Sequence, residues 1–405
     1  MAILDKILVG GFILAFILGA VATRTNFCTM GAVSDWVNMG DKNRFRSWVL
    51  AIAVAILGVT LAAYAGLVDM GLTTSNDTAN PPYRVASFVW LRYIVGGLIF
   101  GIGMTLGSGC GNKTLLRLGG GNLKSVFVLL AISAGASLMI FTNFDYNLFL
   151  QWMTPLAIDF AKMGASGQDI GSVVNALSGV ADSETLNLVF GLAIAALMMI
   201  WVFKSADFRA SGELILAGLV VGLVVAGGWY LTAGSLGQTL LDEAEFMDVR
   251  PYALGAQSFT FVAPTAHAYQ YLTQNLSSEF LTFALVAALG VIAGAFVYSL
   301  LFRKFRFEWF NSFRDFLNHI IGGFLMGIGG VLAMGCTVGQ AITGAATLAL
   351  GSFVAFGSIV LGSALTMKYQ YYKMLYEDAS VADVLLTALA EVHLLPGGMR
   401  RLEAM

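Results

Sequence analysis

Long apolar stretches separated by short polar segments recur along nearly the whole chain. A membrane helix needs about 20 mostly apolar residues, and nine stretches approach that length. They lie at 7–23, 48–67, 88–108, 125–141, 186–203, 213–233, 280–302, 316–335 and 351–367. The pattern predicts an all-α polytopic membrane protein. We expect a transmembrane domain over 1–372 and a cytosolic C-terminal tail over 373–405.

The tail contains one further helical pattern, "SVADVLLTALAEV". Ser380 is the expected N-cap, and Asp383 follows three residues later, as in a capping box. We expect this helix to pack against the inner face of the membrane domain. Docking of a partner protein is the alternative.

The composition supports a membrane protein, because 58% of the residues are hydrophobic and only 11% are charged. Soluble domains carry about 25% charged residues. Neither a long basic run nor a nucleic-acid motif occurs, so no nucleic-acid partner is expected. The three cysteines are far apart and form no CxxC motif, which argues against a disulfide framework or a zinc site. We expect no cofactor and no metal.

Lysine and arginine fall on alternate sides of the expected spans. Three of them, Arg84, Lys162 and Arg250, belong to one set of loops, whereas twelve belong to the other: Lys42, Arg44, Arg46, Lys113, Arg117, Lys124, Lys204, Arg209, Arg303, Lys304, Arg306 and Arg314. Cytoplasmic loops carry the excess of basic residues. The bias predicts an outer N-terminus and a cytoplasmic C-terminus, with the loops 142–185 and 234–279 outside.

Two cysteines end similar glycine-rich stretches. A shift of 226 residues lays "GGLIFGIGMTLGSGC" at 96–110 over "GGFLMGIGGVLAMGC" at 322–336, and eight of the fifteen positions match. We interpret the match as an internal duplication. The two helices cross in opposite directions, so the repeats are inverted. They cover roughly 1–141 and 213–367, joined by a linking helix at 186–203.

Polar, glycine-broken segments follow both cysteines, at 111–122 and 337–351. Irregular backbone at membrane depth must be buried in protein or line a watery cavity, so we expect re-entrant half-helices that line a path. The segment 23–37, with Cys28, has the same character. Its expected inverted counterpart, 229–240, has no cysteine.

Unpaired thiols along a path are weak, soft donors and acceptors that suit a substrate bearing sulfur. An anion would also need helix N-termini and backbone amides, with small polar groups beside them. The expected path residues are Cys28, Cys110, Cys336, Gly109, Gly111, Gly335, Asn112, Lys113, Thr337 and Gln340. Arg92 and His319 are the ionisable residues inside spans, where such groups are costly.

Other readings of the cysteines stay open. Cysteine is a small apolar residue that packs well in any helix. Thiols can also pass electrons by disulfide exchange, which needs a partner within about 7 Å between α-carbons. A membrane thiol redox enzyme and a membrane scaffold are therefore alternatives. No general base lies near the thiols in sequence, so we expect no catalytic residue and no enzyme.

These motifs resemble the YeeE/YedE family of sulfur-transport membrane proteins. The resemblance rests on "NFCTMGAVSD", on the two glycine-cysteine stretches and on the segments that follow them, and it covers essentially the whole membrane domain. It implies a nine-span, hourglass-like, inverted-repeat transporter in the bacterial inner membrane. It also implies uptake of thiosulfate, handed along Cys28, Cys110 and Cys336 through thiol–sulfur hydrogen bonds.

The resemblance further implies a cytosolic sulfurtransferase of the TusA-like type as a partner. Another sulfur or selenium compound is the alternative substrate.

Overall fold

The computed structural model describes residues 3–247 and 249–403. Within these residues, nine helical segments are long and apolar enough to cross a membrane, which confirms the all-α polytopic fold. The long helices are α1 (Ile3–Arg24), α3 (Asn43–Tyr64), α4 (Trp90–Leu106), α6 (Lys124–Phe141), α9 (Ser183–Phe203), α11 (Gly212–Ala233), α14 (Phe283–Leu301), α15 (Phe313–Leu332) and α16 (Leu350–Leu375).

Shorter elements connect these helices. The short α-helices are α2 (Thr29–Met39), α5 (Gly111–Gly119), α7 (Gln151–Met153), α8 (Ile170–Ser178), α10 (Ala206–Ala210), α12 (Ser235–Ala244), α13 (Ala263–Thr273) and α17 (Val381–Glu391). The 3₁₀ and π turns are η1 (Met70–Thr74), η2 (Tyr146–Leu150), η3 (Thr154–Leu156), η4 (Phe160–Met163), η5 (Ser278–Phe280), η6 (Gly339–Gly344), η7 (Ala345–Thr347) and η8 (Gly397–Met399). Strands β1 (Ser87–Phe88) and β2 (Ile158–Asp159) pair antiparallel.

Several helices begin where a side chain satisfies a free backbone amide, as capping requires. Asp182 accepts from Thr185 at the start of α9, Thr282 accepts from Leu285 at α14, and Ser312 accepts from Asp315 at α15. The chain thus defines the starts of these apolar segments with single polar residues.

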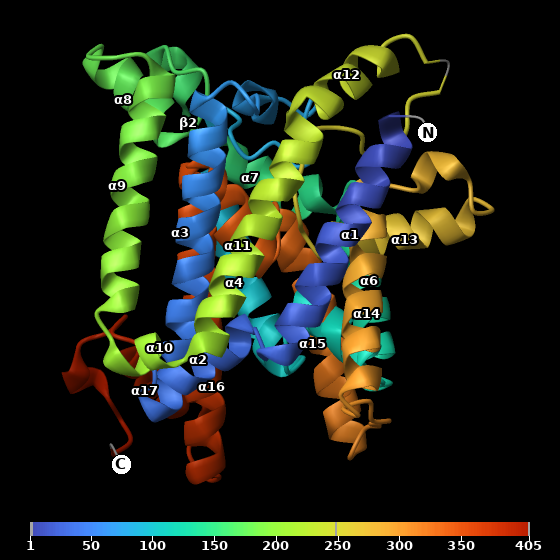
Figure 1. Cartoon of the computed structure of the whole chain (residues 1–405). Coiled ribbons are helices and arrows are strands. Elements are labelled where there is room, and N and C mark those ends of the chain that lie inside the picture. Colours follow the sequence, from blue (N-terminus) through green and yellow to red (C-terminus); the bar gives the residue numbers. More distant parts are fainter. Residues whose placement is uncertain (1–2, 248, 404–405) are drawn as a thin grey trace.

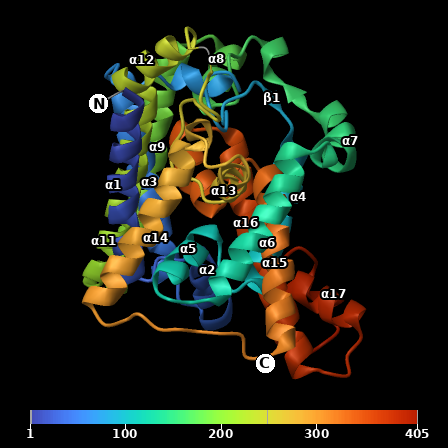
Figure 2. The ribbon, with the colours of Figure 1, turned by 90° about the vertical axis from the view of Figure 1, so that its right-hand side faces the viewer.

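The long helices run between two faces of the molecule (Figure 1). We call the face at which α1 begins the upper face and the face at which α16 ends the lower face. The loops alternate between them, so the described ends of the chain lie on opposite faces. Helices α2 and α5 lie in the lower part of the molecule, whereas α12 and α13 lie in the upper part (Figure 2).

The helices form two groups with short segments between them (Figure 2). One group contains α1, α3, α9, α11 and α14, and the other contains α4, α6, α15 and α16. Glycines allow close approach in the second group. A Cβ on Gly322 of α15 would lie 2.3 Å from the Gly107 amide nitrogen, and a Cβ on Gly329 would lie 2.5 Å from that of Phe100. Backbones of α4 and α15 therefore touch directly, as in other membrane helix pairs rich in small residues.

Packing in the first part of the chain is repeated in the second part. Helix α1 packs on α14 as α11 packs on α3, and α4 packs on α16 as α15 packs on α6. Likewise α2 packs on α3 and α16, while α13 packs on α14 and α6. Helix α5 contacts α14 and α6, and the segment η6–η7 contacts α3 and α16.

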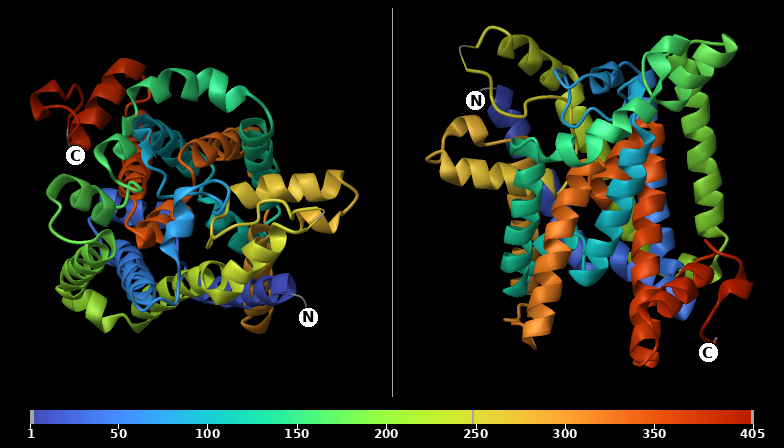
Figure 3. Two further views of the ribbon diagram at one scale, coloured as in Figure 1. Left: turned by 90° about the horizontal axis from the view of Figure 1, so that it is seen from above. Right: turned by 180° about the vertical axis from the view of Figure 1, so that it is seen from behind.

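The tail helix α17 packs against α16 at the lower face and extends beyond the rim of the bundle (Figure 3). The Ser380 hydroxyl accepts from the Asp383 amide at 3.1 Å, as the sequence predicts. The bundle helix α16 is longer than predicted, because it continues to Leu375.

Candidate functional site

Each cysteine follows a helix end with the same backbone geometry. The residue two positions before it has a left-handed backbone, with φ of 52° at Asn26, 58° at Ser108 and 61° at Met334. The next amide then donates back into the preceding helix, from Phe27 to Ala22, from Gly109 to Met104 and from Gly335 to Gly330. This is the Schellman ending, which stops a helix and satisfies its last carbonyls.

The three cysteines also begin the next helical segment. The carbonyl of Cys28 accepts from Ala32, that of Cys110 from Thr114 and that of Cys336 from Gln340, at 3.0, 2.9 and 2.8 Å. Each cysteine thus lies between the end of one helix and the N-terminus of another. A helix N-terminus presents free amides and the positive end of the helix dipole, which favours anions.

The sulfur atoms lie against these N-terminal amides. Cys28 Sγ accepts from the Gly31 amide at 3.4 Å, and Cys336 Sγ accepts from that of Gly339 at 3.5 Å. The Lys113 amide lies beside Cys110 but does not reach capping geometry. All three thiols are free and buried, with at most 4% of any cysteine exposed.

The Phe261 peptide bridges the two cysteine segments related by the 226-residue shift. Its amide donates to Cys336 Sγ at 3.4 Å, and its carbonyl oxygen lies 2.8 Å from the position of a Cβ on Gly111. From this point α5 runs toward the lower face, where the Arg306 amide donates to the Gly120 carbonyl. The other segment runs toward the upper face, where the Ile170 amide donates to the Leu348 carbonyl.

Cys110 lies near both other cysteines, because it interacts electrostatically with Cys28 and with Cys336. The Thr337 hydroxyl faces it but does not reach ordinary hydrogen-bond geometry. The structure therefore brings together the three cysteines that the sequence analysis singled out.

Several buried polar atoms near the thiols or the η6–η7 segment have no hydrogen-bond partner among the described residues. They are the Thr29 and Thr337 hydroxyls, the Tyr83 hydroxyl, Asn112 Oδ1, Gln340 Oε1 and the Ser352 hydroxyl. Each of these residues is at most 2% exposed. A buried polar group without a partner costs about 1–3 kcal/mol, so these atoms have the properties expected of groups that meet a polar ligand.

The other predicted path residues have distinct contacts. Gln340 Nε2 donates one hydrogen bond to the Ala333 carbonyl, and Oε1 has no partner among the described residues. Gly109 and Gly335 do not have a positive φ. Instead, Gly109 lies beside the Lys113 side chain and Gly335 beside that of Gln340.

Basic side chains lie at the lower end of this region. Lys113 Nζ donates to the Asn26 side chain, and Arg117 and Arg44 are close enough to interact with it electrostatically. Arg117 donates to the Ser108 carbonyl at 2.7 Å. Arg44 pairs with Asp35 at 3.2 Å. The basic side chains of Lys113, Arg117 and Arg44 therefore gather near Cys28 and Cys110.

Arg92 and His319, which the sequence places inside spans, have local partners. Arg92 donates to the Leu332 carbonyl at 2.8 Å, where α15 ends. His319 Nδ1 lies 2.8 Å from the Asp315 carbonyl and 3.0 Å from its carboxylate. Arg92 thus stabilises the carboxyl end of α15, the end that attracts cations.

Residues 255–262 correct one sequence expectation. The loop 234–279 was expected to face the outer side of the membrane, whereas its residues Phe259, Phe261 and Val262 are buried in the core. The segment that repeats the packing of α2 is α13, with Val262 as its N-cap, and not 229–240. The uncharged run "GAQSFTFVAPTA" inside an acidic loop was the available signal.

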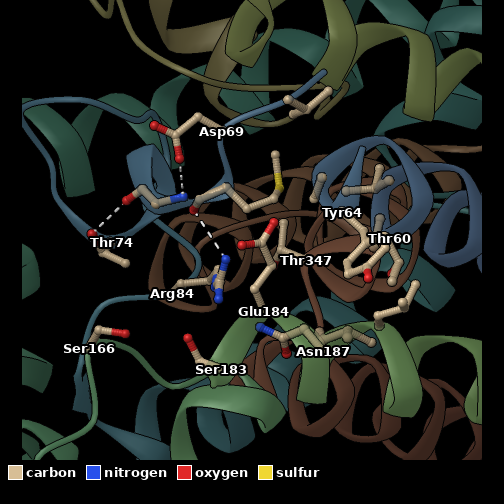
Figure 4. A pocket seen from close by; sticks show the side chains of 18 residues that line it. Thr60, Tyr64, Asp69, Thr74, Arg84, Ser166, Ser183, Glu184, Asn187 and Thr347 are labelled. Carbon is tan, nitrogen blue, oxygen red and sulfur yellow. Dashed lines mark hydrogen bonds between the residues drawn. The ribbon is translucent and has the colours of Figure 1, made fainter. Parts of the chain in front are cut away.

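A separate cavity of about 310 Å³ opens near the upper face (Figure 4). Arg84 lies on its wall, but Asp169 holds the guanidinium through contacts of 2.7 and 2.6 Å. Burial alone would raise the pKa of Asp169, but the charge of Arg84 and hydrogen bonds from Arg84, Asn187 and the Ser172 amide lower it overall. Asp69 and Glu184 also line the cavity and none of the cysteines does, so we do not assign it to an anion.

The comparisons with known proteins identify the family. The family described as "Sulphur transport" matches residues 24–365, most of the described chain and all three cysteines. The chain belongs to the sulphur transport family. This family match confirms the resemblance to the YeeE/YedE group. The protein is therefore a membrane transporter rather than an enzyme.

Two relatives are similar over nearly their full lengths. A thiosulfate transporter, TsuA, of Spirochaeta thermophila is 26% identical over 362 residues, which cover 87% of this chain and 96% of the relative. A thiosulfate transporter, TsuA, of Escherichia coli is 24% identical over 367 residues, which cover 88% of this chain and 93% of the relative.

Proposed function

We propose that this protein takes up thiosulfate across the membrane and that the ion passes Cys336, Cys110 and Cys28 in turn. The observation that carries the proposal is the shared geometry of these cysteines, each at a Schellman helix end and a helix N-terminus. The names of the two similar transporters support the same substrate.

The thiols and the helix N-termini suit the two ends of thiosulfate. Its terminal sulfur is a soft acceptor that a thiol can meet, and its three oxygens need hydrogen-bond donors. The amides that face Cys28 and Cys336 belong to helical turns whose positive ends favour an anion. Sulfate has the same charge but no terminal sulfur, so the thiols supply selectivity.

The proposed order of the cysteines follows from the two short segments. The η6–η7 segment leads from the upper face to Cys336, and α5 and α2 lead from Cys110 and Cys28 to the lower face. An anion entering from the upper face would therefore meet Cys336 first. The basic residues Lys113, Arg117 and Arg44 would attract it at the lower end.

We further propose that the upper face is outside and the lower face is cytoplasmic, in a bacterial inner membrane. The loops that carry twelve of the basic residues all lie at the lower face, in agreement with the positive-inside rule. We also propose that 1–141 and 213–367 are inverted repeats. The repeated packing of α1–α6 in α11–α16 and the equal φ values at Ser108 and Met334 support this assignment.

Net uptake needs a driving force. Moving two negative charges inward against 100 mV costs roughly 4.6 kcal/mol. We propose that a cytosolic sulfurtransferase of the TusA-like type consumes the ion at the lower face. Transport of another sulfur or selenium oxyanion is the second candidate, because the thiols and amides would accept its similar charge and shape.

Growth of a bacterium that cannot assimilate sulfate tests the proposal. With thiosulfate as the sole sulfur source, cells that carry this protein are expected to grow and cells that carry an empty vector are not. Absence of growth, despite protein in the membrane, would reject thiosulfate as the substrate. Parallel cultures on selenium and other sulfur oxyanions test the second candidate.

A further inference from the structure

The buried hydroxyl of Tyr83, near Cys336, makes no hydrogen bond to the described residues that would give it a structural role. Tyr83 is 2% exposed and lies between η1 and β1, on a connection far from Cys336 in sequence. Its hydroxyl oxygen has no hydrogen-bond partner among the residues that the structure describes. A buried tyrosine usually finds a partner for its hydroxyl, so this position needs an explanation.

The ring of Tyr83 lies along η6 and points its hydroxyl at the cysteine end of that segment. A Cβ on Gly344 would lie 2.8 Å from Tyr83 Cδ1, and a Cβ on Gly339 would lie 3.5 Å from the hydroxyl oxygen. Gly339 is also the residue whose amide donates to Cys336 Sγ. The tyrosine hydroxyl and the thiol therefore meet at the same turn, and they interact electrostatically.

Neighbouring residues hold the ring in this position. Trp229 lies edge-on to Tyr83, with ring centroids 6.2 Å apart, and its indole donates to the Thr343 carbonyl at 3.1 Å. The lack of side chains at Gly339 and Gly344 leaves room for the ring. Thus the surroundings fix the phenol while its polar atom stays unsatisfied.

The hydrogen-bond donors around Cys336 differ in whether they are already bonded to the sulfur or are free to bind a ligand. The Phe261 and Gly339 amides and the Thr260 hydroxyl all donate to the sulfur, at 3.4, 3.5 and 3.9 Å. The Tyr83 hydroxyl donates to none of the described residues. Burial raises the pKa of Tyr83 well above its usual value, so the phenol keeps its proton at neutral pH.

We propose that Tyr83 is a substrate-binding residue, whose hydroxyl donates a hydrogen bond to an oxygen of the sulfur oxyanion while the terminal sulfur of that ion contacts Cys336. This inference rests on the proposed function and adds an orientation to it. The oxygen-bearing end of the ion points at Tyr83 and its sulfur at the thiol. Tyr83 therefore contributes affinity for any tetrahedral oxyanion, and the thiol distinguishes thiosulfate from sulfate.

Uptake of ³⁵S-thiosulfate into liposomes that contain purified protein tests this role. Tyr83→Phe keeps the ring and removes only the hydroxyl, so the concentration for half-maximal uptake should rise about tenfold to hundredfold. Tyr252→Phe is the matched control, because Tyr252 packs on His267 and Phe280 away from the cysteines. It should keep the wild-type value.

The outcomes separate the two claims. A half-maximal concentration within about twofold of wild type for Tyr83→Phe would overturn the role of Tyr83 and leave the transport function intact. Absence of uptake by the wild-type protein itself would overturn both the transport function and the role of Tyr83. A purely structural role would instead lower the thermal midpoint and the amount of active protein without changing the half-maximal concentration.

A second substitution covers the case in which Tyr83→Phe does not accumulate. Incorporation of 3-fluorotyrosine at position 83 keeps the ring packing and makes the hydroxyl a stronger donor. The half-maximal concentration should then fall below that of wild type. An unchanged or higher value would count against a hydrogen bond from this hydroxyl to the substrate.

Discussion

Ser108 and Met334 have the same left-handed backbone, with φ of 58° and 61°, and each lies two residues before a buried cysteine. They are also 226 residues apart, the shift that aligns the two glycine-cysteine stretches. The amides that follow them donate to Met104 and Gly330, which obey the same shift. The duplicated stretches therefore encode one helix ending that positions a thiol.

This relationship predicts opposite effects of two substitutions at Ser108. A left-handed backbone costs about 1–2 kcal/mol for residues with a Cβ and is worse for β-branched residues. Ser108→Gly should keep or increase stability and retain uptake. Ser108→Val should lower stability and displace Cys110. Thermal midpoints in detergent and thiosulfate uptake check both, and equal behaviour of the two variants would contradict the strained-turn assignment.

The crossing of α4 and α15 predicts a strong effect at Gly322. A Cβ there would lie 2.3 Å from the Gly107 nitrogen and 2.7 Å from the Gly103 carbonyl oxygen, so Gly322→Ala must push the two backbones apart. Overpacking of this kind costs about 1–3 kcal/mol. Gly357→Ala on α16 is the control, because nothing lies within 4 Å of its Cβ position. Thermal unfolding in detergent should separate the two variants, and equal midpoints would refute direct backbone contact.

His267 predicts a pH dependence of stability. Burial lowers its pKa from 6.5 to about 4, and its Nδ1 lies 3.1 Å from the Thr282 hydroxyl. The folded protein therefore excludes a proton that the unfolded chain binds below pH 6.5. This contribution is present above pH 6.5 and is lost as the pH falls toward 4, by about 3 kcal/mol in total.

Melting curves between pH 7.5 and 4.5 test this dependence. The difference in thermal midpoint between wild type and His267→Gln should shift in favour of the variant as the medium becomes more acidic. A constant difference over this range would mean that His267 takes up a proton equally well in the folded and unfolded protein.

The membrane architecture was predictable because apolar length alone specifies spanning helices. The equivalent positions of Cys110 and Cys336 could also be predicted from the sequence, because the glycines around them match in the two stretches. The left-handed residues were not, since Ser108 and Met334 occupy those positions while the adjacent glycines, Gly109 and Gly335, do not have a positive φ. Tertiary contacts override the local preference of serine and methionine there.

The contacts that distant loops make near Cys336 could not be predicted from a local sequence pattern. Tyr83 and Phe261 reach the Cys336 turn from connections between spans, and neither lies in the two glycine-cysteine stretches that the 226-residue shift aligns. The run 255–262 is too short to span a membrane, so its lack of charge did not by itself indicate burial. Contacts of this kind depend on how the two helix groups face each other.

The most direct test of the thiol path is thiosulfate uptake by Cys110→Ala and Cys336→Ala in liposomes, with wild type as reference. A hydrogen bond to a charged group contributes about 1.5–3 kcal/mol, so each variant should lose at least about tenfold in uptake while keeping its thermal midpoint and elution volume. Wild-type uptake by both folded variants would contradict transport along the cysteines.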